Sequence, residues 1–428
     1  MDNTVQIMLS KIRFCFPLFL LFQTTVTPVH AAPKAALEIF SYWTSGSEAA
    51  ALKALLDLYK EQNPGVEIVN ATVAGGNGSA ALPVLQARLL GGNPPDTWQT
   101  HPGSELFNRY VAAGKCESVT QLYASEGWSK VVPAQLVHLM SQNGQTYCVL
   151  AGVHRANVLW YNKKVLAKQG ITTGDTLTFQ EFLAAANKLQ TAGITPLAVG
   201  DSGIWTSTCL LENCLLANLH ASGWNDLCNN KIPWNDPRVL AAVRWYKQLL
   251  DFENPNHAAL SWDQAIASVI EGKCAFSVMG DWAYGEFKKA NQKDNEDFGW
   301  ANFPETEGSF DMVGDGFTLA TGAPHRNEAL QWLKILGSKE GQLAFNKIKG
   351  SIPVRTDIDP KEFGPYHQWS MNSFAHDSIV PSVFEGEATT PAFQQALNDA
   401  VSTFSGDKNV DRLVRTMVGA AAESSSSD

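Results

Sequence analysis

A change of side-chain periodicity near the start of the chain constrains the fold more than any other feature. Leu37 and Ile39 alternate with their neighbours as the buried positions of a strand do. A little further on, Leu52, Leu55 and Tyr59 return at helical spacing and share one face. A strand followed directly by an amphipathic helix predicts an α/β architecture.

The loop that joins this strand to this helix has the sequence Tyr42-Trp43-Thr44-Ser45-Gly46-Ser47-Glu48. In open α/β sheets, ligands bind beyond the carboxyl ends of the strands, which is where this loop lies. Flat aromatic faces beside hydroxyl and carboxylate groups suit a sugar. The alternative is that two core aromatics precede a helix capped by Ser45 or Ser47.

Strand and helix patterns alternate along the rest of the chain. Further strands are expected at residues 66–70, 96–101, 144–150, 158–162, 276–279 and 317–320, and further helices at 81–90, 103–110, 163–169, 178–191, 241–250, 262–270 and 327–336. Thr178-Phe179-Gln180-Glu181 fits a capping box at the start of one of these helices. Such alternation predicts parallel or mixed sheets covered by helices, and 428 residues predict two domains.

The first 31 residues resemble an export signal. Lys11 and Arg13 precede a short apolar run, and Val29-His30-Ala31 offers a small-residue cleavage pattern, so we expect cleavage after Ala31. The run is too short to span a bilayer. We therefore expect an exported, periplasmic protein, whose Ser-rich tail from Ala420 (residues 420–428) is disordered.

The charge balance limits the class of partner. The chain has 32 Lys and Arg against 42 Asp and Glu, and no basic run, so we expect no nucleic-acid partner. Thirteen tryptophans are many for this length, and aromatic faces are common in carbohydrate sites.

Six cysteines follow the expected signal segment. In an exported protein an even number permits disulfides. The pairings that we expect are Cys116–Cys148 and one local bridge among Cys209, Cys214 and Cys228. Cys274 lies in an apolar run and is expected to remain an inert thiol.

Several separate stretches of the chain match one known family in the same order. They are Tyr42–Glu48, Pro94-Pro95-Asp96-Thr97-Trp98-Gln99, His154–Asn162, Ser261-Trp262-Asp263-Gln264-Ala265, Val278-Met279-Gly280-Asp281-Trp282 and Lys349–Arg355. The chain thereby resembles the extracellular solute-binding proteins (family 1) of sugar ABC transporters, the class that includes maltose-binding protein. More closely, it resembles the periplasmic glucose/mannose-binding proteins.

This resemblance implies an α/β, two-lobed periplasmic binding protein fold with a hinge and a ligand cleft between the lobes. By it, lobe 1 comprises residues 32–142 and 302–350, and lobe 2 comprises residues 143–301 and 351–419. The implied function is the non-enzymatic binding of a monosaccharide and its delivery to a membrane permease. The protein is expected to be a monomer and to need no cofactor or metal ion.

The resemblance also assigns the sugar contacts. They are Tyr42, Trp43, Glu48, Gln99, His101, Trp262, Asp315, Lys349 and Glu385. Alternatives stay open for three of them: Trp262 in the core, His101 on the surface, and Asp315 in a simple Gly-Asp-Gly turn. His154 and Arg155 either line the cleft or pair with acidic neighbours.

Two positions depart from the family pattern. The family usually has two tryptophans where this chain has Tyr42-Trp43, and a His near the position of Glu385. An ionised Glu385 only accepts hydrogen bonds and needs a partner, for which Lys349 is the expected candidate. The alternative is that Glu385 points to solvent.

One other function class competes with the binding protein. A secreted carbohydrate-active enzyme would use cleft carboxylates such as Glu48, Asp281 or Asp315 as acid and base. The sequence has no Ser-His-Asp motif, nucleophile elbow or metal motif, so it assigns no catalytic residue.

Overall fold

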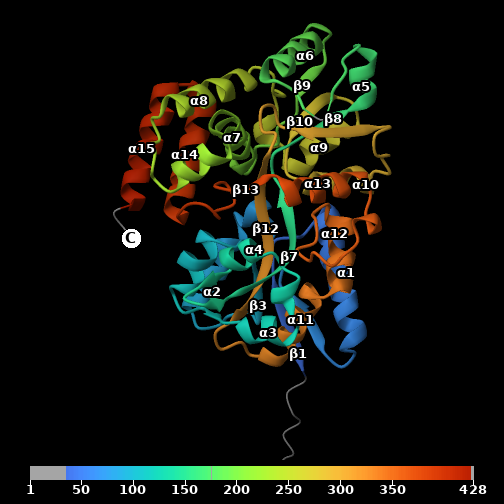
Figure 1. The fold of residues 1–428 in the computed structure, drawn as a ribbon, viewed down its shortest axis with the longest axis vertical. Coiled ribbons are helices and arrows are strands. Elements are labelled where there is room, and N and C mark those ends of the chain that lie inside the picture. Colours follow the sequence, from blue (N-terminus) through green and yellow to red (C-terminus); the bar gives the residue numbers. More distant parts are fainter. Residues whose placement is uncertain (1–34, 175, 426–428) are drawn as a thin grey trace, which may run out of the picture. The chain divides into compact units, whose positions relative to one another are not determined.

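The computed structural model describes residues 35–174 and 176–425 (Figure 1). The predicted signal segment and its cleavage site after Ala31 lie outside these residues. Two sheets and a small hairpin organise the described chain.

The first sheet has seven strands. Its main path runs in the order β13-β12-β3-β1-β2, and β4 and β7 also pair with β12. The bounds are β1 Ala36–Phe40, β2 Glu67–Asn70, β3 Thr97–Thr100, β4 Cys116–Glu117, β7 Cys148–Arg155, β12 Ser309–Ala320 and β13 Ser378–Pro381. Because β1 is parallel to both β2 and β3, the loops after these strands leave the sheet at one edge.

The second sheet has four strands in the order β11-β8-β10-β9. Their bounds are β8 Val158–Asn162, β9 Thr195–Leu197, β10 Cys274–Val278 and β11 Phe298–Asn302. The short strands β5 (Ser141–Gln142) and β6 (Gln145–Thr146) form the separate hairpin.

Helices surround both sheets (Figure 1). Those joined mainly to the first sheet are α1 Gly46–Gln62, α2 Ala81–Leu90, α3 Thr120–Ser125, α4 Ala134–Leu139, α11 Arg326–Gly337 and α12 Lys339–Lys349. The others are α5 Lys163–Lys168, α6 Phe179–Thr191, α7 Trp205–Cys228, α8 Pro237–Leu249, α9 Trp262–Ile270, α10 Trp282–Lys289, α13 Pro365–His376, α14 Pro391–Asp407 and α15 Val410–Ser425. None of the helices in the described part of the chain is long and apolar enough to cross a membrane.

The expected alternation of strands and helices is confirmed, and so is the capping box. Thr178 Oγ1 accepts a hydrogen bond from the Glu181 backbone N–H, and Glu181 Oε2 accepts one from the Thr178 N–H. The two bonds satisfy donors that the first turn of α6 otherwise leaves unpaired.

The start of α1 differs from the prediction. Ser45 occupies the N-cap position, but its side chain makes no capping hydrogen bond. Instead the Glu286 Oε1 carboxylate oxygen, from α10, accepts a bond of 2.7 Å from the Ser47 N–H. Gly46, at φ +60°, suits this approach, because a Cβ there would lie 2.2 Å from that oxygen.

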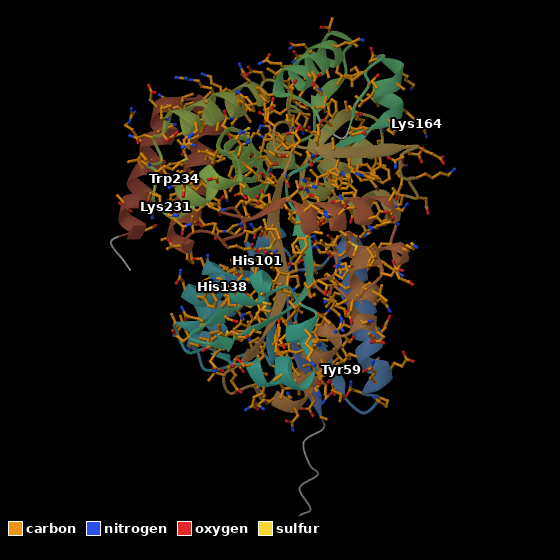
Figure 2. All side chains as sticks on the ribbon, viewed as in Figure 1. Tyr59, His101, His138, Lys164, Lys231 and Trp234 are labelled. Carbon is orange, nitrogen blue, oxygen red and sulfur yellow. The ribbon has the colours of Figure 1, made fainter. Side chains whose placement is uncertain are left out.

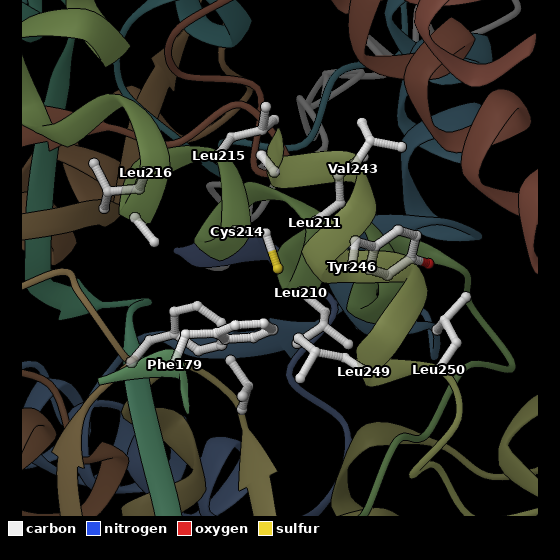
Figure 3. Packing of buried hydrophobic residues seen from close by; sticks show 14 of the residues in the cluster. Phe179, Leu210, Leu211, Cys214, Leu215, Leu216, Val243, Tyr246, Leu249 and Leu250 are labelled. Carbon is white, nitrogen blue, oxygen red and sulfur yellow. The ribbon is translucent and has the colours of Figure 1, made fainter. Parts of the chain in front are cut away.

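Each sheet has its own hydrophobic core. Leu37, Ile39, Leu52 and Leu55 are buried in the core of the first sheet, as their periodicity predicts. Figure 3 shows part of the core of the second sheet, in which Phe179 and residues of α7 and α8 pack together.

The chain passes between the two sheets twice at short connections. Residues 156–157 join β7 to β8, and residues 303–308 join β11 to β12. β7 pairs with β12 along most of its length and so belongs to the first sheet, although the prediction placed residues 143–155 in lobe 2. β13 also pairs with β12.

The predicted disulfides do not form in the structure. Each of the six cysteines at positions 116–274 is a free thiol. Cys209 and Cys214 lie on one helix five residues apart, on different faces, and Cys228 is at the far end of that helix, beyond a kink at His220. Cys116 and Cys148 lie on separate strands, opposite Ala320 and Thr318 of β12.

The predicted disordered tail is wrong for most of its length. α15 continues through Ser425, and residues 426–428 lie outside the described part. Leu413, Met417 and Ala420 recur at helical spacing and pack into the core of the second sheet. This apolar face stabilises the helix in the segment for which the Ser-rich composition predicted disorder.

Candidate functional site

A small cavity of about 30 Å³ collects almost all of the predicted ligand contacts. Every one of them except Gln99 lines it. The lining consists of Tyr42, Trp43, Glu48, Asn77, His101, His154, Trp205, Trp262, Trp282, Val313, Asp315, Lys349 and Glu385.

The strand order explains why these residues meet. Tyr42 and Trp43 follow β1 and His101 follows β3, and the two strands are parallel neighbours. Asp315 lies on β12, next to β3 in the sheet. Figure 2 labels His101 on the ribbon.

Asp315 lies in a strand and not in the turn that its glycine neighbours suggested. β12 runs through the Gly-Asp-Gly sequence, with a register irregularity between Asp315 and Gly316. A Cβ at Gly316 would lie 2.2 Å from Cys148 Sγ on β7. The glycine therefore permits the close approach of the neighbouring strand.

Gln99 supports the site from behind. Its Nε2 donates to Asp315 Oδ1 at 3.2 Å, and its Oε1 accepts from the Tyr42 N–H at 3.3 Å. The side chain is buried and does not line the cavity. Gln99 thus orients two lining residues.

Lys349 is the central cation of the cavity. Its Nζ donates to Glu48 Oε1 at 2.9 Å and lies 3.7 Å from Asp315 Oδ2. It also lies 5.6 Å from the ring centres of Trp43 and of Trp282. Burial opposes its charge, but the two carboxylates outweigh burial and raise the pKa of Lys349. Lys349 pairs with Glu48 and Asp315. The prediction that it pairs with Glu385 is wrong.

Two alternatives were open for His154, lining the cleft or pairing with acidic neighbours, and the structure shows both. Its Nε2 is 2.9 Å from Asp315 Oδ2, and its Nδ1 bonds with Asp281 Oδ1. Burial and Lys349 oppose its charge, but Asp281 and Asp315 prevail and raise the pKa of His154. Asp315, facing His154 and Lys349, has a lowered pKa despite its burial.

His101 is buried, not on the surface. Its Nδ1 lies 3.1 Å from Glu105 Oε2 and its Nε2 lies 2.9 Å from Tyr42 Oη. Glu385 Oε2 is 3.4 Å from the same Nε2. Burial disfavours the imidazolium, but Glu105 and Glu385 outweigh it and raise the pKa of His101 to about 10.

Aromatic side chains form much of the remaining wall. Trp262 begins α9 and is 8% exposed, so it belongs both to a buried aromatic cluster and to the cavity lining. Trp205 and Trp282 line the cavity too, and the sequence did not single them out as contacts. The only sequence feature that pointed to Trp282 as a contact was its place in Val278–Trp282, a stretch that matches the family. No sequence feature pointed to Trp205.

Asn77 and Val313 are the other lining residues that the sequence missed. Asn77 lies in a short 3-10 helix, Gly76–Gly78, and its Nδ2 donates to the Phe384 carbonyl at 3.1 Å. This bond ties the short helix to the segment that carries Glu385.

Comparison with known proteins identifies the family. Residues 43–343 match the model of the bacterial extracellular solute-binding protein family. The chain belongs to this family. An extracellular-binding protein of an ABC transporter from Pyrococcus horikoshii, itself uncharacterized, is 35% identical over 398 residues, with 92% of this chain and 89% of that protein covered.

Another relative of this solute-binding protein carries a more informative name. A probable sugar-binding periplasmic protein of Rhizobium meliloti is 32% identical, with 90% of this chain and 93% of that protein covered. Among solved structures, a chitin oligosaccharide binding protein superposes with a TM-score of 0.80 at 19% identity, over 92% of this chain and 99% of that one. This likeness confirms the predicted α/β periplasmic binding protein fold.

The donor set of the solute-binding protein argues against a metal centre in this cavity. Among residues 35–174 and 176–425, no group of three or more His, Cys, Asp or Glu is arranged to hold a metal ion. The cavity carboxylates Glu48 and Asp315 are engaged by Lys349 and His154. The arrangement instead offers hydrogen-bond partners beside aromatic surfaces.

Proposed function

We propose that this solute-binding protein binds a monosaccharide of the glucose/mannose class and delivers it to the membrane permease of an ABC importer. The observation that carries the proposal is the mixed lining of the cavity, in which charged hydrogen-bonding groups stand beside tryptophan rings. A pyranose has apolar faces and a rim of hydroxyls, so it needs both kinds of partner. The name of the Rhizobium meliloti relative supports the proposal that the ligand is a sugar.

The free space between the lining side chains is about 30 Å³, close to the volume share of one water molecule, so the two sides of the cavity must part to admit a sugar. Charged partners such as Lys349 and Asp315 form the stronger hydrogen bonds, about 1.5–3 kcal/mol each, and would set specificity.

The two sheets with their helices are proposed to be two lobes that close around the sugar. The cavity takes Tyr42, His101 and Asp315 from the first sheet and its loops, and Trp262 and Trp282 from helices of the second. A ligand that contacts both sides favours the closed arrangement. The connections at residues 156–157 and 303–308 are the proposed hinge.

Calorimetric titration with a panel of monosaccharides tests this function. We expect saturable binding of at least one hexose, a smaller radius of gyration by small-angle scattering at saturation, and full recovery of the unchanged sugar after hours of incubation. Turnover of the sugar would favour the carbohydrate-active enzyme instead. No binding of any monosaccharide, with binding of an oligosaccharide, would contradict the proposed size of the ligand.

The proposal makes a specific prediction for Trp262. Trp262→Ala should weaken sugar binding by about 1–2 kcal/mol, because an aromatic contact and its buried area are lost. Calorimetry measures the affinity, and circular dichroism shows whether the variant is folded.

Trp245→Ala is the matched control. Trp245 lies on α8 and stacks on Phe179 at 3.9 Å between ring centres, and it does not line the cavity. Its loss should reduce stability and leave sugar affinity unchanged. A folded Trp262→Ala protein that binds like the wild type would place Trp262 in the core alone.

A further inference from the structure

One carboxylate in the cavity lacks a hydrogen-bond partner. Glu385 follows β13, lines the cavity and is only 5% exposed. Its backbone N–H donates to Ser382 Oγ at 3.2 Å, which fixes the main chain. Its Oε2 atom is buried and accepts no hydrogen bond from any residue that the structure describes.

The nearest cation is already engaged elsewhere. His101 Nε2 is 3.4 Å from Glu385 Oε2, but it lies 2.9 Å from Tyr42 Oη. The other ring nitrogen of His101 faces Glu105 Oε2 at 3.1 Å. Lys349 bonds with Glu48. His101 therefore leaves Glu385 incompletely satisfied, and no lysine or arginine among the described residues pairs with it.

The cavity and its immediate support contain more carboxylates than cations. The cations are Lys349, His101 and His154, and the carboxylates that pair with them or face the cavity are Glu48, Glu105, Asp281, Asp315 and Glu385. Even with both imidazoles charged, negative charge is in excess. An ionised carboxylate buried without a partner is costly, so Glu385 calls for either a proton or a cation.

We propose that the ligand is a hexose with a free amino group, whose ammonium pairs with Glu385. This inference rests on the proposed function and specifies the class of sugar. The ammonium supplies the missing donor and offsets the excess negative charge. Lys349 and Asp315 remain available to the hydroxyls, and the tryptophans to the faces of the ring.

The competing arrangement is a neutral hexose with a protonated Glu385. A protonated carboxyl donates one hydrogen bond and can serve a hydroxyl in place of the ammonium. The two arrangements differ in proton balance. Burial and the neighbouring carboxylates Asp315, Glu105 and Glu212 raise the pKa of Glu385 to about 8, although His101 opposes them. An arriving ammonium would release that proton, whereas a neutral sugar would retain it.

Calorimetry with glucosamine, glucose and N-acetylglucosamine tests the inference on the wild-type protein. At pH 6.5, glucosamine should bind about ten- to a hundredfold more tightly than glucose, the scale of one charged hydrogen bond. Titration in two buffers of different ionisation enthalpy should show proton release with glucosamine only. N-acetylglucosamine, whose nitrogen is uncharged, should lose the advantage.

The variant Glu385→Gln keeps the size of the side chain and removes its charge. It should abolish the preference for glucosamine over glucose. Glu61→Gln, the same substitution at an exposed position of α1, is the control and should keep the wild-type ranking.

Each outcome bears on the inference. Equal or tighter binding of glucose by the wild type would overturn it and leave the proposed function standing, and this result does not depend on whether a variant folds. A glucosamine preference that survives in Glu385→Gln would overturn the role of Glu385. Failure of every monosaccharide to bind would overturn the proposed function and the inference with it.

Discussion

Lys349→Met is expected to lower the free energy of unfolding by about 3–5 kcal/mol, because removing one partner of a buried ion pair leaves the other charge uncompensated. Lys349 is 2% exposed, and its ammonium is the direct partner of Glu48 and lies close to Asp315. Methionine matches the length of the stem but not the charge. The substitution should also abolish sugar binding if the proposed function holds. Urea denaturation measures the first effect and calorimetry the second.

Lys347→Met is the control for this prediction. It lies on the same helix, α12, and pairs at 3.3 Å with Glu362, which is itself exposed. A surface pair of this kind contributes about 0–1 kcal/mol. Similar losses in the two variants would show that Glu48 and Asp315 do not depend on the Lys349 charge.

The candidate site was predictable because it follows from the order of strands and loops. Tyr42 and Trp43 come directly after one predicted strand and His101 ends another, and parallel strands bring such positions to one edge of a sheet. Trp262 and Lys349 came from the family resemblance, and the structure places both at the same cavity. Local pattern and resemblance therefore sufficed to find most of the lining.

Contacts between distant segments were not predictable from local patterns. Glu286 caps a helix 239 residues away in sequence, where Ser45 or Ser47 was the expected cap. Glu105 is buried beside His101, although a charged residue early in a helix is usually a solvated one. In both cases a long-range partner decided the outcome.

The other corrections have the same origin. Gly314-Asp315-Gly316 has the composition of a turn, but β7 and β12 approach so closely at Gly316 that glycine is needed inside a strand. The Ser-rich ending suggested disorder, whereas Met417 and Ala420 are held by the core of the second sheet. An even cysteine count permits disulfides, but it does not bring thiols on α7 together.

Two buried histidines are expected to titrate in opposite directions. His101 faces the carboxylates of Glu105 and Glu385, and these outweigh its burial and raise its pKa to about 10. His367, on α13, bonds through Nε2 to the Asn346 carbonyl at 3.0 Å, and its Nδ1 has no partner. Burial there prevails over the carbonyl and lowers the pKa of His367 to about 4.

Between pH 5 and 9 the free protein should thus contain a charged His101 and a neutral His367. Because the folded chain keeps a proton on His101 that the unfolded chain loses near pH 6.5, the stabilising contribution of His101 is complete below pH 6.5. It should fall by about 1.4 kcal/mol per pH unit from there to about pH 10.

The pH dependence of the His367 contribution has the opposite sign. This contribution should be lost as the pH falls from 6.5 to about 4. Nitrogen-15 chemical shifts of the two imidazoles, assigned with His101→Gln and His367→Gln, report both charge states directly. The difference in unfolding free energy between the wild type and His101→Gln, from urea denaturation at pH 6.5, 8 and 9, reports the slope. Deprotonation of His101 below pH 7.5 would contradict the charge assigned to the cavity, since Glu105 would then lack the cation that faces it.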